Sequence, residues 1–186
     1  MTKIEKGPRT SVYPLPAALV SAFDKNGKPN ALAAAWVSNI CFEPPTAVVG
    51  IRDSRYSFEL IESAGCYGIN IPSVDIVKKV DYFGMVSGRD HNKFEETGLT
   101  VFEGKYVKVP LIEECPINIE CKVTQIVKIG SHSAFFGEIL NVYYDESMMD
   151  EKGLPDLLLG DIIAYGGGKY YRLKEVVGKQ GFSKKD

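Results

Sequence analysis

The sequence lacks the features that mark membrane, secreted and nucleic-acid-binding proteins. No uninterrupted apolar run approaches the ~20 residues that cross a bilayer, and the first residues contain no apolar segment of the secretory kind. Neither charge sign dominates, because 22 lysines and arginines are interspersed with 24 aspartates and glutamates. The one basic cluster, Lys184 and Lys185, is typical of a solvated tail. We therefore expect a cytoplasmic protein with neither nucleic acid nor membrane as a partner.

Cysteine and histidine are also scarce. The chain has four cysteines, none of them in a Cys-x-x-Cys pair, and two histidines. Zinc sites use clusters of these residues, so no metal site is predicted. We interpret the cysteines as small core residues. For Cys41 a redox-active thiol is the alternative, although no second cysteine lies nearby in the sequence to resolve a disulfide.

Two glycine-based phosphate motifs are missing. There is no Gly-x-Gly-x-x-Gly and no regular alternation of strands and helices, which argues against a dinucleotide-binding fold. The triplet Gly166, Gly167 and Gly168 lacks both the strand-to-helix context and the Lys-Ser/Thr pair of a phosphate loop. We predict instead that it connects the two strands of a hairpin over residues 162–173.

What the sequence does contain is a strand-rich pattern in a chain of one-domain size. It has 186 residues, 45% of them hydrophobic, which fits a single domain over residues 1–186. In residues 116–129 apolar side chains share one parity and polar side chains the other, as in a strand with one buried face. Residues 132–144 are the expected antiparallel partner. Many strands and few helices predict a mainly β fold, closed or nearly closed as a barrel.

Shorter elements are predicted around this framework. A strand over residues 17–23 should lead through a type I′ turn at Asn26-Gly27 into a strand over residues 29–37. Ser73 is expected to cap a helix that reaches residue 83, because apolar side chains there recur at helical spacing.

The most informative stretch covers residues 30–57. Ala33, Ala34 and Ala35 would let a flat ligand lie against an extended backbone, although a tightly packed strand is the alternative. Arg52 and Arg55 stand with serines just before a predicted helix, where free N–H groups and the helix dipole suit a phosphate. Capping of that helix by a serine is the competing interpretation. A flat surface beside an anion site suggests a mononucleotide.

Four blocks of the sequence resemble the flavin reductase-like family. Its fold is the FMN-binding split barrel of Greek-key type, and the resemblance is to its flavoredoxin branch. The blocks are residues 30–45, residues 52–57 with 65–70, Ser87-Gly88 with Lys93-Phe94, and the stretch from Gly130 to Glu138. No block is a strong motif by itself, and their order and spacing carry the match.

The resemblance implies one bound FMN, with the isoalloxazine along the strand and the phosphate at the loop before the helix. The implied cofactor-binding residues are Ala34, Ala35, Trp36, Val37, Ser38, Asn39, Arg52, Ser54, Arg55, Tyr56, Ser57, Asn70, Ser87, Gly88 and Lys93. His132 matches a histidine near the flavin, where a nicotinamide or an acceptor would stack. Hydride transfer to flavin needs no base, so we do not assign it as one.

The function implied is that of an FMN-dependent oxidoreductase of flavin reductase type, taking electrons from NADH or NADPH. The alternative is a flavoredoxin-like electron carrier that depends on a redox protein partner. Flavin reductases commonly have a small residue at the position of Trp36. The larger tryptophan ring could partly shield the flavin face on which a nicotinamide would stack. A third interpretation is a barrel that serves only as a binding or scaffold protein. The resemblance also implies a homodimer with FMN near the interface.

Overall fold

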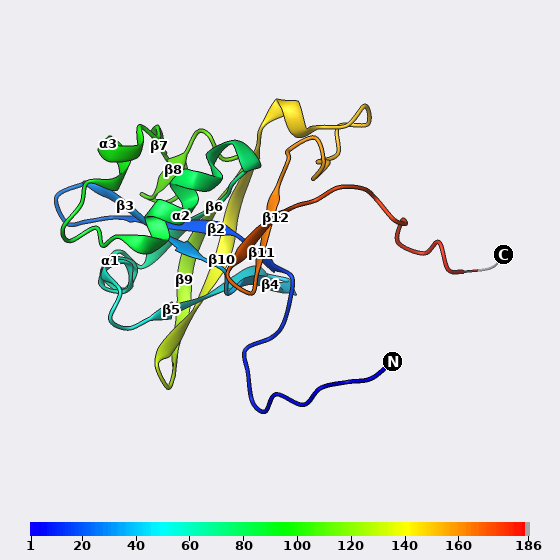
Figure 1. Cartoon of the computed structure of the whole chain (residues 1–186). Coiled ribbons are helices and arrows are strands. Elements are labelled where there is room, and N and C mark those ends of the chain that lie inside the picture. Colours follow the sequence, from blue (N-terminus) through cyan, green and yellow to red (C-terminus); the bar gives the residue numbers. More distant parts are fainter. Residues whose placement is uncertain (185–186) are drawn as a thin grey trace.

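A computed structural model describes residues 1–184. Lys185, one of the two lysines expected to form a solvated tail, lies outside the described residues. The strands are β1 (Leu15–Pro16), β2 (Ala18–Phe23), β3 (Pro29–Ala34), β4 (Val37–Phe42), β5 (Pro45–Arg52), β6 (Cys66–Ile71), β7 (Val101–Glu103), β8 (Pro110–Ile112), β9 (Ile117–Ile129), β10 (His132–Tyr144), β11 (Ile163–Gly166) and β12 (Lys169–Arg172). The helices are α1 (Tyr56–Ala64), η1 (Val74–Ile76), α2 (Val77–Met85), α3 (Lys93–Thr97) and η2 (Glu146–Met148). Figure 1 shows both terminal segments leaving the sheet.

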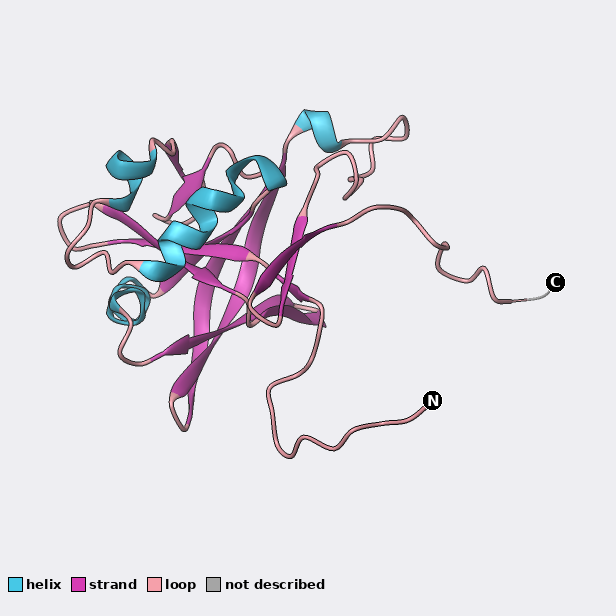
Figure 2. Ribbon diagram, viewed as in Figure 1, coloured by secondary structure: helices cyan, strands magenta, loops and turns pink. Residues whose placement is uncertain are grey.

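The main sheet has seven strands in the order β3-β2-β6-β9-β10-β5-β4. Its two edge strands, β3 and β4, follow one another in the chain with only Ala35 and Trp36 between them. The edges are therefore brought towards each other by their own connection, and Gly50 N donates a hydrogen bond to Trp36 O at 2.8 Å. The sheet is left open between β3 and β4. The mainly β, barrel-like fold is as predicted, with its strands visible in Figure 2.

Two of the three core clusters among the described residues lie on opposite sides of β2. Val20, Tyr67 and Phe135 belong to a buried cluster inside the curved sheet. Leu19 and Phe83 belong to a second cluster beneath α2 and α3. Both faces of β2 are thus covered, and Figure 2 shows α2 lying across the sheet. This arrangement puts the end of α2 beside β3, where a cleft forms. No helix within residues 1–184 is long and apolar enough to cross a membrane.

The long hairpin of β9 and β10 matches the predicted strands, but the predicted solvent face of β9 is wrong. Asn118 and Glu120 belong to that polar face, yet they are 5% and 0% exposed. The segment that contains β8 covers them. Asn118 Nδ2 donates to Ile112 O at 2.8 Å, and Glu120 accepts three backbone N–H groups from the loop before β8. Polar side chains are buried here because their hydrogen bonds are satisfied.

Three shorter elements also differ from expectation. The predicted strand over residues 29–37 ends at Ala34, because the chain turns through Ala35 and Trp36 into β4. The turn after β2 is not type I′, since only Gly27 has a positive φ, of 81°. Asp24 Oδ1 accepts the N–H groups of Asn26 and Lys28 at 2.8 Å each, which holds the turn in another geometry.

Ser73 stands at the N-terminus of the expected helix, but its side chain makes no capping hydrogen bond. The segment begins as the short 3₁₀ turn η1 and continues as α2.

Candidate functional site

A cleft of about 520 Å³ opens where β3, the N-terminus of α1 and the loop after α2 meet. The residues that line it are Asn30, Leu32, Ala33, Arg52, Ser54, Arg55, Tyr56, Ser57, Phe83, Gly84, Val86, Ser87, Gly88, Arg89, Asp90 and Lys93. Two predicted blocks that are separate in the sequence therefore line one cavity. These are the loop over residues 52–57 and the group of Ser87, Gly88 and Lys93.

The N-terminus of α1 faces this cleft without a side-chain cap. Arg55 is the N-cap residue, with extended backbone, and it makes no capping hydrogen bond. The competing interpretation, capping by Ser54 or Ser57, is therefore not what the structure has. Ser57 Oγ instead accepts a hydrogen bond from Asn30 Nδ2 at 2.8 Å. Phe58 N donates to Arg55 O at 3.0 Å, so the N–H groups of Tyr56 and Ser57 and the positive end of the helix dipole remain available to an anion.

Gly88 forms a wall of the cleft that no larger residue can replace without displacement. A Cβ built on Gly88 would lie 2.0 Å from Asn30 Oδ1 and 3.2 Å from Tyr56 Cδ1. Asn30 is itself buried and held by Ser57, so it has little room to move. The glycine keeps the backbone of this loop close to β3.

Lys93 closes the inner end of the cleft. Its side chain is almost fully buried, and Nζ donates to the carbonyl oxygens of Ala31, Phe83 and Val86. Burial, followed by the nearby positive charge of Arg55, lowers the pKa of Lys93 to about 8. The ammonium thereby ties β3 to the C-terminal end of α2.

Arg89 connects the two walls at the mouth of the cleft. Its guanidinium is ion-paired with Glu59 on α1, donates to Ser54 O at 3.4 Å, and lies 5.2 Å from the centre of the Tyr56 ring. Because the side chains in these contacts are partly exposed, we infer that the contacts position the loop and add little to the free energy of unfolding.

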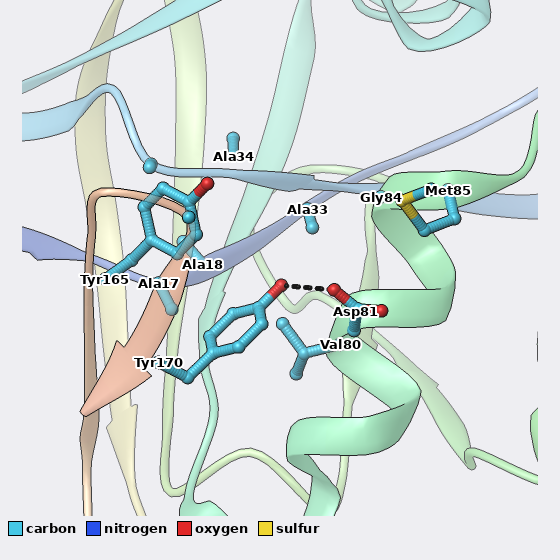
Figure 3. A pocket seen from close by; sticks show the side chains of 12 residues that line it. Ala17, Ala18, Ala33, Ala34, Val80, Asp81, Gly84, Met85, Tyr165 and Tyr170 are labelled. Carbon is cyan, nitrogen blue, oxygen red and sulfur yellow. Dashed lines mark hydrogen bonds between the residues drawn. The ribbon is translucent and has the colours of Figure 1, made fainter. Parts of the chain in front are cut away.

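A second cavity of about 390 Å³ adjoins the cleft, and the two share Ala33 and Gly84. Figure 3 shows the alanines of β3 at this cavity: the methyl group of Ala33 lies on the side of Tyr170 from the last hairpin, and that of Ala34 points to the opposite side of the strand. Tyr170 Oη donates to Asp81 Oδ1 at 3.1 Å, which links β12 to α2. Ala35 also lines this cavity. We call the surface made by Ala33, Ala34 and Ala35 the alanine shelf.

Trp36 and His132 lie together beyond the end of the shelf. Their ring centroids are 4.5 Å apart at an interplanar angle of 42°. His132 pairs in register with Arg52, which lines the cleft, and its Nδ1 lies 2.9 Å from Ser131 Oγ. Burial, followed by the charge of Arg52, lowers the pKa of His132. The imidazole is therefore neutral at pH 7.

Other predicted residues lie outside the cleft and the shelf. Val37 and Ser38 line a third cavity, of about 420 Å³, together with residues of the N-terminal segment. Asn39 is exposed on the edge strand β4, and so is Cys41, whose interpretation as a core residue is wrong. The other three cysteines are buried as expected.

Asn70 must be withdrawn from the predicted cofactor-binding residues. It is fully buried in the core. Its Nδ2 donates to Leu19 O and Ser21 Oγ, and its Oδ1 accepts from Ile112 N and Asn118 Nδ2. All of its hydrogen-bonding capacity is used inside the protein, so it has none left for a ligand.

Sequence reasoning missed Asn30 and Gly84 as lining residues. Asn30 carried a usable signal, since asparagine is uncommon within a strand and here follows a turn into small apolar residues. Gly84 had no such signal. A Cβ on it would lie 3.3 Å from Ala33 Cβ, and that proximity arises only from the packing of α2 on β3.

Comparison with known proteins gives consistent results. The model of a family described as "Flavin reductase like domain" matches residues 10–174. Flavoredoxin of Desulfovibrio vulgaris (Miyazaki F) has a TM-score of 0.93 at 35% identity, covering 98% of this chain and 99% of its own. Flavoredoxin from Methanosarcina acetivorans has a TM-score of 0.91 at 32% identity, covering 98% and 97%. A Shewanella frigidimarina protein with a split barrel domain has a TM-score of 0.81 at 25% identity, covering 89% and 85%. The expected split β-barrel is confirmed.

Proposed function

This chain belongs to the flavin reductase-like domain family, and on that premise we propose that it binds FMN and passes electrons from a reduced donor to an acceptor. The observation that carries the proposal is the cleft. An uncapped helix N-terminus, two arginines of the adjoining loop and a buried ammonium meet there. Backbone N–H groups and cationic side chains at a helix N-terminus are the donor set that suits a phosphate.

The residues present fit the whole of the cofactor. The phosphate would lie between α1 and Gly88, and the flavin ring would extend over the alanine shelf, which shares Ala33 with the cleft. Small side chains there let a planar ring approach the backbone. FMN, when bound, supplies the redox chemistry. The protein holds the phosphate, positions the ring, and places neutral His132 beside Trp36 as a flavin-proximal group.

We propose NADH or NADPH as the donor of the oxidoreductase. A nicotinamide must stack on an open face of the flavin. The Trp36 and His132 rings lie together at the end of the shelf, so their position decides whether that face is open. The acceptor is a separate question, because the cavity of about 390 Å³ at the shelf is the space that the flavin ring itself would occupy.

A second candidate function is electron transfer without a nicotinamide donor. It is favoured by the likeness to two flavoredoxins over nearly the whole chain. The large Trp36 ring also favours it, because a ring at the end of the shelf reduces the space for a stacked nicotinamide. In this case a redox protein would be the partner.

We further propose that the protein is a homodimer with FMN near the interface. The edge strand β4 carries apolar side chains that are unusually exposed in the single chain, since Ile40 is 50% and Phe42 is 101% exposed. Trp36, immediately before this strand, is 42% exposed. Exposed apolar groups clustered on an unpaired strand edge are typical of an interaction surface. Sedimentation equilibrium measures the molecular mass in solution. A mass equal to that of one chain would contradict the dimer.

The first expected result is that the purified protein takes up FMN stoichiometrically. Titration into protein freed of flavin should quench flavin fluorescence and shift its visible absorption. Arg55→Gln should weaken the affinity on the order of tenfold, because one charge-assisted phosphate contact is lost. Glu62→Gln, on the exposed part of α1 outside the cleft, is the matched control and should change nothing. A colourless protein with no FMN uptake would sink the proposal.

The two candidate functions separate on the behaviour of Trp36. Under anaerobic stopped flow, NADH or NADPH should bleach the bound flavin if the protein is the oxidoreductase. If the Trp36 ring limits access, Trp36→Ala should accelerate this bleaching by at least tenfold, while Trp36→Phe should give an intermediate rate. A flavin that neither nicotinamide reduces, in wild type or Trp36→Ala, would favour the electron carrier.

A further inference from the structure

The last hairpin, made of β11 and β12, presents two tyrosine rings on one of its faces. Tyr165 and Tyr170 are paired directly across the two strands, and Ala164 is paired with Tyr171 at the next position. Because side chains alternate between the faces of a strand, the first pair shares one face and the second pair lies on the other. The ring centroids of Tyr165 and Tyr170 are 5.4 Å apart at an interplanar angle of 59°. The two rings thus form one aromatic surface.

This aromatic surface faces the cavity of about 390 Å³ at the alanine shelf. Both tyrosines line that cavity, and Figure 3 shows Tyr170 on the same side of β3 as the methyl group of Ala33. Both side chains are half-buried, and Tyr170 also packs against the core cluster beneath α2 and α3. The cavity is therefore lined by small aliphatic side chains from β3 and by aromatic rings from the hairpin.

The hairpin is held in this place by contacts outside the main sheet. It belongs to a separate three-stranded sheet, in which β11 pairs with the two residues of β1. A bridge joins Ile162 to Ser73, and Tyr170 Oη donates a hydrogen bond to Asp81 Oδ1 on α2 at 3.1 Å. Burial, followed by this hydrogen bond, raises the pKa of Tyr170 to about 12, so the hydroxyl remains a donor at neutral pH. Asp81 thereby holds the Tyr170 ring beside the cavity.

A surface of this kind suits a flat aromatic ligand. Aromatic rings attract one another in offset and tilted arrangements, which add to the free energy of binding beyond the buried area. The alanines of the opposite wall let such a ligand lie close to the backbone, because their side chains are small. Arg55 and Ser57, at the end of the cleft where we propose that the phosphate binds, do not line this cavity. The aromatic surface can therefore contact a ring without contacting the phosphate.

We propose that Tyr165 and Tyr170 determine the specificity for the flavin ring, which they contact from the hairpin side of the cavity and independently of the phosphate. The proposal rests on the proposed function, since the ring is that of FMN. Asp81 is a positioning residue, which acts on the ring through Tyr170. It follows that the affinity for riboflavin, which lacks the phosphate, depends on the two tyrosines as strongly as the affinity for FMN.

The test compares FMN with riboflavin in fluorescence titrations at pH 7. Tyr165→Leu and Tyr170→Leu should each weaken the binding of both ligands by about three- to tenfold, as expected for the loss of one aromatic contact, and leave the ratio of the two affinities unchanged. Arg55→Gln should weaken the binding of FMN alone. Tyr171→Leu, on the other face of the same hairpin and 50% exposed, is the matched control and should change neither affinity. Tyr165→Leu and Tyr170→Leu proteins that bind both ligands as Tyr171→Leu does would overturn the proposal.

Tyr170→Phe separates the ring from its hydroxyl. It keeps the aromatic contact and removes the hydrogen bond to Asp81, so the melting temperature of flavin-free protein should fall while riboflavin affinity stays within about threefold of the wild type. A loss of affinity as large as that of Tyr170→Leu would show that binding needs the hydroxyl and not the ring.

Tyr165→Leu leaves the bond to Asp81 in place, so it decides the question if Tyr170→Leu does not fold. Wild-type protein that binds neither FMN nor riboflavin would contradict the proposed function as well. Binding of both ligands that does not depend on Tyr165 and Tyr170 would contradict only the role of the two tyrosines.

Discussion

Replacing Gly88 with alanine should lower FMN affinity by about 30- to 100-fold, the equivalent of about 2–3 kcal/mol. The added Cβ would lie 2.0 Å from Asn30 Oδ1, far inside contact distance. Asn30 must therefore turn away, and its hydrogen bond to Ser57 Oγ is lost. Ser57 belongs to the first turn of α1, so the loss reaches the end of the cleft at which we propose that the phosphate binds. Fluorescence titration with FMN measures the change.

A double-mutant cycle identifies the cause. In an Asn30→Ala background the obstructing oxygen is gone, so Gly88→Ala should add little further loss of affinity. Gly160→Ala is the matched control, because its Cβ would meet Met148 Cβ at 3.3 Å, a similarly tight contact in a glycine that lines neither the cleft nor the adjoining cavity. If Gly88→Ala changes the affinity less than threefold, or changes it equally in both backgrounds, the close approach of this loop to β3 does not shape the site.

Replacing Glu120 with alanine should lower the free energy of unfolding by about 3 kcal/mol, mostly through buried hydrogen-bonding groups that lose their partner. Glu120 is fully buried. It accepts N–H groups of Lys105, Tyr106 and Val107 at 2.8 to 3.0 Å and the hydroxyl of Tyr143 at 2.7 Å. These bonds hold the loop before β8 over the sheet. Urea unfolding at pH 7 measures the loss.

The same carboxylate should make stability depend on pH. Burial raises the pKa of Glu120, but the hydrogen bonds from Tyr143 and the three N–H groups outweigh burial, and the net pKa lies below its ordinary value of 4.5. A lowered pKa in the folded state means that the stabilisation is complete above pH 4.5 and is lost as pH falls through the folded value. Glu120→Gln should remove this part of the acid slope.

FMN affinity is the control for the predicted loss of stability in Glu120→Ala. It lines neither the cleft nor the shelf, so FMN affinity of the folded variant should equal that of the wild type. Glu120→Gln keeps one acceptor oxygen and should cost less than Glu120→Ala. A loss below 1 kcal/mol in Glu120→Ala would show that water satisfies the loop amides after the change, and that the carboxylate does little for stability.

Predictions from the sequence succeeded where the signal is local. The alternation in residues 116–129 identified β9, and the same reasoning located β10. Serines and arginines before a helical pattern located the loop of residues 52–57, which lines the cleft. Alternation failed on Asn118 and Glu120, which look like solvent-facing residues of a strand. Their burial comes from β8 and the loop before it, and a strand's own pattern contains no information about what another segment places on it.

Strand periodicity and helix-start chemistry depend on neighbours in the chain, so the sequence alone was enough to predict the mainly β fold, its long hairpin, and the small-residue and arginine-containing stretches that line the cavities. Only the tertiary structure decided which of those residues share a site. It withdrew Asn70 into the core, exposed Cys41, and added Asn30 and Gly84 to the walls of the cleft. It also buried the ammonium of Lys93 among backbone carbonyl groups, which no spacing could reveal. The physical reason is that desolvation and close contact are set by segments that meet in space, such as β3, α1 and the turn after α2, however far apart they lie in the chain.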